Sequence, residues 1–132
     1  MAKTIITAAL TGAVTPAGYD IPETPQQIAD CAYECWKAGA SVVHLHMRDD
    51  NGAGVMDPVK FYETVKAIRA YKDCDVIVNC ISSGDNRVSD DSPYGNAMRM
   101  LHHKNVPGIE MGTFDASSFN WGIPGGVFHN SP

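Results

Sequence analysis

Short apolar segments recur along this chain, and each is followed by a stretch in which apolar residues repeat with helical spacing. Thr4–Leu10 is rich in β-branched and small apolar residues, which predicts a buried strand. Ser41–His46, Asp75–Ile81 and Gly108–Met111 have the same character and predict three further strands. These segments begin 33 to 37 residues apart. The sequence therefore predicts a repeated unit of one strand and one helix.

Helix start signals lie between the predicted strands. Thr24–Gln27 combines an N-cap threonine, a proline at the first helical position and a glutamine at the third, which is a capping box, and Gly39 suits the left-handed residue after the helix. Asp57-Pro58 and Ser92-Pro93 predict the starts of two more helices. The apolar faces expected to be buried are Ile28, Cys31, Ala32, Cys35 and Trp36; Phe61, Val65 and Ile68; and Tyr94, Ala97, Met98 and Leu101.

The order of elements favours one α/β architecture over another. Apolar strands that alternate with amphipathic helices imply a parallel sheet covered by helices, either an open doubly wound sheet or a (β/α)8 barrel. Leu10–Val14 does not match the glycine-rich phosphate turn of doubly wound nucleotide binders, so the (β/α)8 TIM-barrel type is favoured. Eight such units need about 250 residues. Residues 1–132 are therefore expected to form the N-terminal half of a TIM-barrel domain, with about the first four βα units.

Composition and charge narrow the class of protein. The chain has 10 Lys and Arg against 15 Asp and Glu, and its net charge of −5 argues against a nucleic-acid partner, because the phosphate backbone requires a basic surface. At 44% hydrophobic residues the chain is expected to fold, and it has no apolar run long enough to cross a bilayer. The four cysteines are dispersed along the sequence, a pattern that fits reduced thiols better than disulfide bonds. Lys3 and the residues after it resemble a short signal peptide, but the single positive charge and interspersed threonines favour a cytoplasmic location.

His44-Leu45-His46 is the most informative triplet in the sequence. Because side chains alternate across a strand, His44 and His46 should point to the same side at the carboxyl end of the second predicted strand. Barrel enzymes place their sites at that end, and two imidazoles there can bind one Zn²⁺. The alternative is that the rings fill the barrel mouth and hydrogen-bond to neighbours. His102-His103, adjacent near the end of a helix, cannot easily share a metal and are expected at the surface.

Polar residues also follow the other predicted strands. Ser82–Gly84 can turn backbone N–H groups toward an anion, although such turns are common without a ligand. Arg48-Asp49 follows the histidines: the arginine can meet an anionic substrate or pair with a carboxylate, and the aspartate can orient an imidazole or belong to an acidic turn before Asn51-Gly52. Glu110 can act as an acid, a base or a ligand beside a metal, or form a salt bridge in the barrel.

Several segments together resemble the β-keto acid cleavage enzymes, a family whose best-described member acts in lysine fermentation. The segments occur in the family's order and cover nearly the whole chain. They are Ile6–Ala13, Ile21–Pro25, Ala38–Ala40, Val43–Arg48, Ile81–Gly84, Met111–Thr113 and Val127–Pro132.

The resemblance implies a zinc-dependent TIM barrel in which His44 and His46 bind the metal, while Ser82, Ser83 and Gly84 hold the carboxylate of a 3-keto acid. It implies that zinc polarises the keto acid, that a base removes a proton from C2, and that the carbanion attacks the thioester carbonyl of acetyl-CoA. Acyl transfer to CoA and carbon–carbon cleavage then release acetoacetate and a new acyl-CoA. The expected partners are a 3-keto acid and acetyl-CoA, with Zn²⁺ as the cofactor.

The chain departs from the family pattern at positions that bear on the substrate. Val14 stands where members that cleave amino-keto acids carry a glutamate for the ammonium group, so an uncharged or apolar substrate side chain is expected. Asp85 replaces a usual glycine after the third strand, and Gly108 and Glu110 replace polar residues of the fourth. Val14 and Glu110 are therefore predicted to border the substrate.

The resemblance places the third zinc ligand, a glutamate, with the catalytic aspartate and an arginine on strands later than Pro132, so no catalytic base is assigned in this sequence. A half-barrel exposes edge strands and apolar helix faces, which favours a homo-oligomer. Two other functions fit the sequence. One is a metal-dependent hydrolase of the amidohydrolase type, which also carries His-x-His on a barrel strand, and the other is a catalytically silent fragment that serves as a folding or association module.

Overall fold

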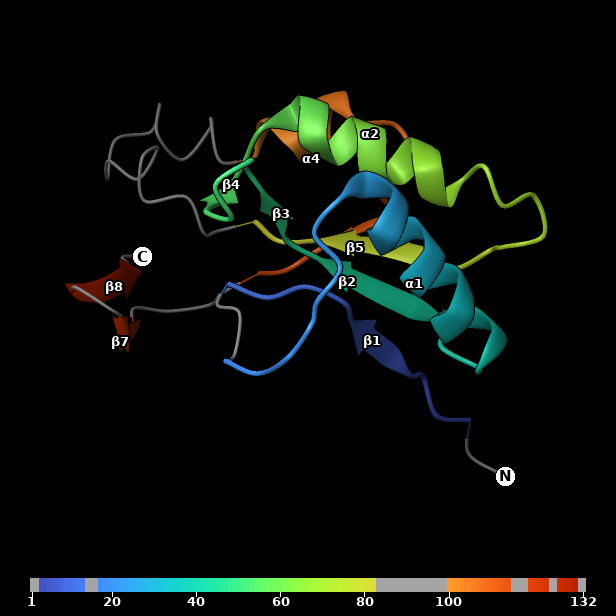
Figure 1. Cartoon of the computed structure of the whole chain (residues 1–132), viewed down its shortest axis with the longest axis horizontal. Helices are drawn as coiled ribbons and strands as arrows, with labels where there is room; N and C mark the ends of the chain where they lie inside the picture. Colours follow the sequence, from blue (N-terminus) through green and yellow to red (C-terminus); the bar gives the residue numbers. More distant parts are fainter. Residues whose placement is uncertain (1–2, 14–16, 83–99, 115–118, 124–125, 131–132) are drawn as a thin grey trace.

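The computed structural model describes residues 3–13, 17–82, 100–114, 119–123 and 126–130 of the chain. Its centre is a parallel sheet of four strands (Figure 1). They are β1 (Thr7–Ala9), β2 (Val42–Leu45), β5 (Ile77–Cys80) and β6 (Met111–Gly112).

The strands of this sheet lie in the order β1-β2-β5-β6, so neighbours in the sheet are also neighbours in the sequence. This order lacks the reversal of a doubly wound sheet and agrees with the predicted barrel type. The strand starts are 34 or 35 residues apart, which confirms the predicted repeat. The register aligns Ala9, His44, Asn79 and Met111 in one row across the sheet.

Two long helices begin as their capping signals predict. In α1 (Pro25–Lys37), the Thr24 hydroxyl accepts from the Gln27 N–H at 3.2 Å, and the Gln27 side chain accepts from the Thr24 N–H at 3.1 Å. In α2 (Pro58–Ile68), the Asp57 carboxylate accepts from the Val59 N–H at 2.9 Å. Gly39 follows α1 with a φ of 107°, a left-handed conformation that glycine adopts without steric cost.

The core lies between these helices and one face of the sheet (Figure 1). Val43, Leu45 and Val78 are fully buried there. They pack in one cluster with apolar residues of the helices: Ile28, Ala29, Ala32, Phe61, Val65 and Ile68. Since strand side chains alternate, His44, Asn79 and their row neighbours project from the other face. None of the helices in the described residues has the length and apolar character needed to span a membrane.

His102 corrects the sequence-based expectation. It lies in the short helix α4 (Leu101–Asn105), and it is buried rather than at the surface. Its ring stacks on Phe61 with centroids 4.0 Å apart, and its Nε2 donates to the Ile81 carbonyl at 2.7 Å. His103 is half-buried against Gly112, where an added Cβ would lie 2.7 Å from the ring. Because α4 packs against α2 and the sheet together, flat imidazoles fill the narrow space between them.

Two antiparallel hairpins were not expected as strands. Met47–Arg48 (β3) pairs with Gly54–Val55 (β4) around the predicted Asn51-Gly52 turn. Further along, Phe119–Ile123 (β7) pairs with Gly126–Asn130 (β8). The predicted helix start at Ser92-Pro93 lies outside the described residues.

The cap of α1 gives a direct test of the local fold. Thr24→Ala removes the hydroxyl that satisfies the Gln27 N–H and should lower the free energy of unfolding by about 1 kcal/mol. Thr24→Ser keeps that hydroxyl, so its free energy of unfolding should stay close to that of the original chain. Urea denaturation followed by circular dichroism measures both variants. Equal stability of the alanine and serine variants would show that the capping box contributes nothing.

Candidate metal centre

The two strand-borne histidines meet at the carboxyl edge of the sheet. His44 lies in β2 and His46 directly follows that strand, so both project from the face opposite the helices. The Nε2 atoms of the two rings are 3.1 Å apart, and the ring planes are inclined by 78°. The predicted same-side arrangement is therefore the one observed.

This spacing fits two ligands of one metal ion. Zinc bonded tetrahedrally to imidazole nitrogens at 2.0–2.1 Å holds two such nitrogens about 3.3–3.4 Å apart. The observed Nε2–Nε2 distance of 3.1 Å is close to that value. The described residues contain no group of three or more histidine, cysteine, aspartate or glutamate side chains able to hold a metal. Two nitrogens are fewer than a zinc site needs, and at 3.1 Å the two Nε2 atoms are also within hydrogen-bond distance of each other, which is the alternative that the sequence left open.

Asn79 orients the first imidazole. Its side-chain oxygen lies 3.1 Å from His44 Nδ1, and the residue is 9% exposed. An amide oxygen accepts only, so Nδ1 carries the proton and Nε2 presents its lone pair toward His46. Asn79 is not among the site residues predicted from the sequence. A signal was available, because this is a polar residue in an apolar strand at a position that faces the same side as His44.

The second imidazole is held in its neutral form. Burial, reinforced by the neighbouring His44 and the positive charge of Arg48, lowers the pKa of His46 from 6.5 to about 4. Burial opposes the imidazolium because a charged ring loses hydration that its surroundings do not replace. His46 is therefore unprotonated at neutral pH, which is the form that binds metals.

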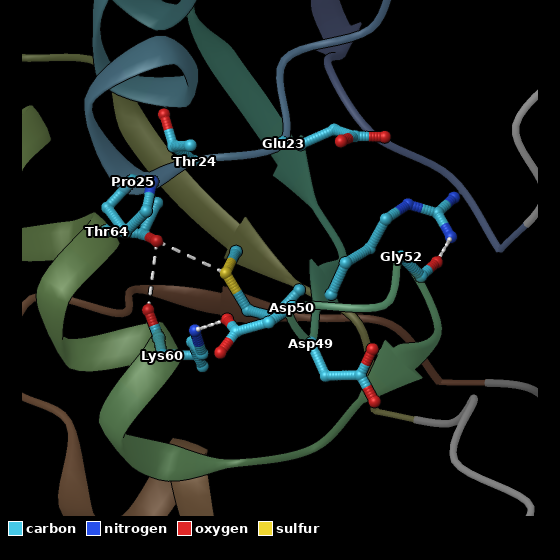
Figure 2. Close-up of a pocket in the computed structure, with 10 residues that line it drawn as sticks. Glu23, Thr24, Pro25, Asp49, Asp50, Gly52, Lys60 and Thr64 are labelled. Atoms are coloured by element: carbon cyan, nitrogen blue, oxygen red, sulfur yellow. Dashed lines mark hydrogen bonds and ion pairs between the residues drawn. The ribbon is translucent and has the colours of Figure 1, made fainter.

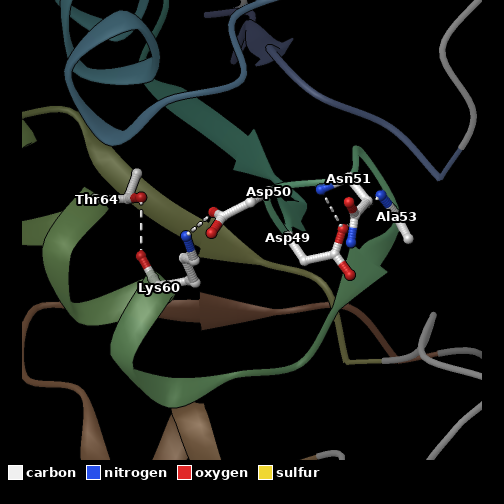
Figure 3. Close-up of polar contacts among 6 residues, drawn as sticks. All are labelled: Asp49, Asp50, Asn51, Ala53, Lys60 and Thr64. Atoms are coloured by element: carbon white, nitrogen blue, oxygen red, sulfur yellow. Dashed lines mark hydrogen bonds and ion pairs between the residues drawn. The ribbon is translucent and has the colours of Figure 1, made fainter.

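The polar residues after His46 shape a hairpin. The Asp49 carboxylate accepts from the N–H groups of Asn51 and Ala53 at 2.9 and 3.0 Å (Figure 3). The acidic turn, one of the two interpretations of Asp49, is thus what the structure shows. Arg48 donates to the carbonyl oxygens of Gly52 and Gly12 at 2.8 and 2.7 Å.

A cavity of about 310 Å³ lies beside this hairpin, between the start of α1 and the first turns of α2 (Figure 2). Its lining includes Thr24, Arg48 and Lys60, and the Lys60 ammonium pairs with the Asp50 carboxylate at 2.8 Å. Neither His44 nor His46 lines it. The cavity is therefore separate from the histidine pair.

The predicted substrate residues are placed differently from one another. Ser82 follows β5 at the same edge of the sheet as His46 follows β2, and its N–H donates to the Thr113 hydroxyl at 3.2 Å. Ser83, Gly84 and Val14 lie outside the described residues.

Glu110 is not brought to the histidines. Its carboxylate pairs with Arg69 at the end of α2 and accepts from the Val78 N–H at 3.0 Å. This places it on the helix side of the sheet, whereas the next residue, Met111, shares the row of His44. The salt bridge that the sequence left open as an alternative is therefore present.

Comparison with known proteins identifies relatives of the whole chain. The family model of the β-keto acid cleavage enzymes matches residues 3–132. The 3,5-dioxohexanoate:acetyl-CoA acetone transferase of Paraburkholderia graminis and the 3-keto-5-aminohexanoate cleavage enzyme of Fusobacterium nucleatum are each 36% identical over 124 residues. These matches cover 92% of this chain but only 37% and 42% of the two relatives.

A solved structure supports the fold. The ternary complex of ObcA with a C4-CoA adduct and oxalate matches with a TM-score of 0.66 at 21% identity, over 85% of this chain and 26% of that one. The fold is of the (β/α)8 TIM-barrel type, and this chain covers about the first four βα units. With the family model matched from residue 3 to residue 132, the chain belongs to the β-keto acid cleavage enzyme family.

Proposed function

We propose that this chain is part of a zinc-dependent enzyme that condenses a 3-keto acid with acetyl-CoA and releases acetoacetate and a new acyl-CoA. The observation that carries the proposal is the pair of imidazole Nε2 atoms 3.1 Å apart at the carboxyl edge of a parallel sheet. The names of the two relatives support it, because one is an acetyl-CoA acetone transferase and the other is a keto acid cleavage enzyme.

On this proposal, His44 and His46 would hold the metal, and Ser82 would help to position the substrate carboxylate. His44, oriented by Asn79, and neutral His46 donate nitrogen lone pairs to the ion. Bound zinc supplies the positive charge that polarises a keto carbonyl and favours removal of the proton at C2. Ser82, anchored to Thr113, fixes the start of the serine-glycine turn, which we propose holds the substrate carboxylate through backbone N–H groups.

The third metal ligand and the catalytic base come, on this proposal, from later βα units of the barrel. The matched relatives are more than twice as long as the segment that they share with this chain. In a closed barrel the face that carries His44 turns inward, so later strands can bring side chains toward the same ion.

The substrate is proposed to have an uncharged side chain, because Val14 cannot pair with an ammonium group. The Paraburkholderia relative is named for 3,5-dioxohexanoate, a keto acid without such a group. A cytoplasmic location accords with the free thiols of Cys31, Cys35, Cys74 and Cys80.

Zinc binding by the histidine pair is directly measurable. His44→Ala and His46→Ala should each lower the zinc affinity of the chain at least about tenfold, because one of the two nitrogen ligands is lost. His103→Ala is the matched control, since this imidazole packs against Gly112 and should leave the affinity unchanged. Competition with a chromogenic chelator gives the dissociation constants. Equal affinities in all three variants would exclude the site.

Asn79 provides a second test. Asn79→Ala frees the His44 ring and should weaken zinc binding by about tenfold, as is usual when the partner of a ligating histidine is removed. Asn79→Asp keeps an acceptor for the Nδ1 proton and should retain the affinity. The same chelator competition distinguishes them. Equal losses in both variants would assign Asn79 a packing role only.

The reaction itself is tested by isotope labelling. With the rest of the barrel supplied, a 3-keto acid labelled at C1 should pass its label to acetoacetate, and release should require acetyl-CoA. Mass spectrometry follows the label. Product formation from the keto acid without acetyl-CoA would instead support a hydrolase.

A further inference from the structure

A single hydroxyl group joins the end of β1 to the residue that carries the second imidazole. The last backbone hydrogen bond between β1 and β2 runs from the Leu10 N–H to the His44 carbonyl, at 3.1 Å. One residue later, the Thr11 hydroxyl accepts from the His46 N–H at 2.6 Å and donates to the His46 carbonyl at 2.8 Å. Thr11 is 4% exposed, so water does not readily compete for these groups.

The hydroxyl replaces two bonds of the parallel ladder. If β1 continued, its backbone would accept from the His46 N–H and donate to the His46 carbonyl. β1 ends at Ala9, and the Thr11 side chain satisfies both groups instead. The N–H and carbonyl of a residue belong to the peptide planes before and after its Cα. Bonds to both groups therefore restrain both dihedral angles of His46 and fix the direction of its Cα–Cβ bond.

Arg48 restrains the residue that follows Thr11 in the sequence. Its Nη2 donates to the Gly12 carbonyl at 2.7 Å, and its Nη1 donates to the Gly52 carbonyl in the hairpin turn at 2.8 Å. At 9% exposure the guanidinium is largely withdrawn from solvent. It thereby links the segment after β1 to the β3–β4 hairpin, which begins directly after His46.

We propose that Thr11 is a positioning residue that holds the His46 imidazole opposite His44 Nε2. His46 needs such support because it lies between two strands: β2 ends at Leu45 and β3 begins at Met47. His44, by contrast, is held within the β1-β2-β5 ladder. The role of Thr11 in metal binding rests on the proposed function, whereas its role in orienting the ring does not.

The test compares Thr11→Val, which keeps the shape and removes both bonds, with Thr11→Ser, which keeps the hydroxyl. Thr64→Val is the matched control, because Thr64 is also buried and its hydroxyl contacts the Lys60 carbonyl and the Met47 sulfur but makes no bond to the backbone of His46. Thr11→Val should lower zinc affinity on the order of tenfold. It should also shift the His46 imidazole resonances in ¹H–¹⁵N spectra of the metal-free chain. Thr11→Ser should retain the zinc affinity and the His46 resonances of the original chain. Thr64→Val should likewise change neither quantity.

The possible outcomes distinguish the positioning role of Thr11 from the proposed zinc-dependent function. If the original chain binds no zinc but Thr11→Val still shifts the His46 resonances, the positioning role stands and the proposed function fails. If Thr11→Val leaves both the resonances and the affinity unchanged, or matches Thr64→Val in both, the inference is overturned. Hydrogen exchange of the original chain tests the contact without any variant: the His46 amide should be as protected as amides within β2, and rapid exchange would overturn the inference.

Discussion

Alternation of side chains along β2 is the constraint on which the site depends. Val43 and Leu45 are fully buried against the helices, so His44 between them must face the other way, and His46 follows on the same side. A shift of one residue would place an imidazole in the apolar core and expose both aliphatic side chains. The hydrophobic effect that holds the helices on the sheet therefore also brings the two imidazoles together.

Alternation puts the two imidazoles on one face of the sheet, and hydrogen bonds from neighbouring segments then orient them. Asn79 of β5 fixes the tautomer and orientation of the His44 ring, and Thr11 after β1 holds the backbone of His46. Both residues are largely buried, where a hydrogen bond has little competition from water. The placement of the two imidazoles thus depends on three adjacent segments of the sheet, which hold the two Nε2 atoms 3.1 Å apart.

Local signals allowed much of the fold to be predicted. The caps at Thr24 and Asp57 are contacts between residues close in sequence, and the repeat of strands follows from the local pattern of apolar residues. The roles of His102, Thr11 and Asn79 depend on partners in other elements, and only Asn79 stands out in the sequence, as a polar residue within an apolar strand. The position of His102 near a helix end predicts a surface location, because the helix dipole favours cations there, but the ring of Phe61, far away in the sequence, stacks on this imidazole and buries it.

The central claim, that the two Nε2 atoms bind one divalent ion, is tested most directly by X-ray absorption at the zinc edge on the chain loaded with one equivalent of zinc. The account predicts imidazole scattering from at least two nitrogens at about 2.0–2.1 Å, and loss of one imidazole contribution in the His46→Ala variant. A spectrum of zinc surrounded by water alone, unchanged by that substitution, would contradict it.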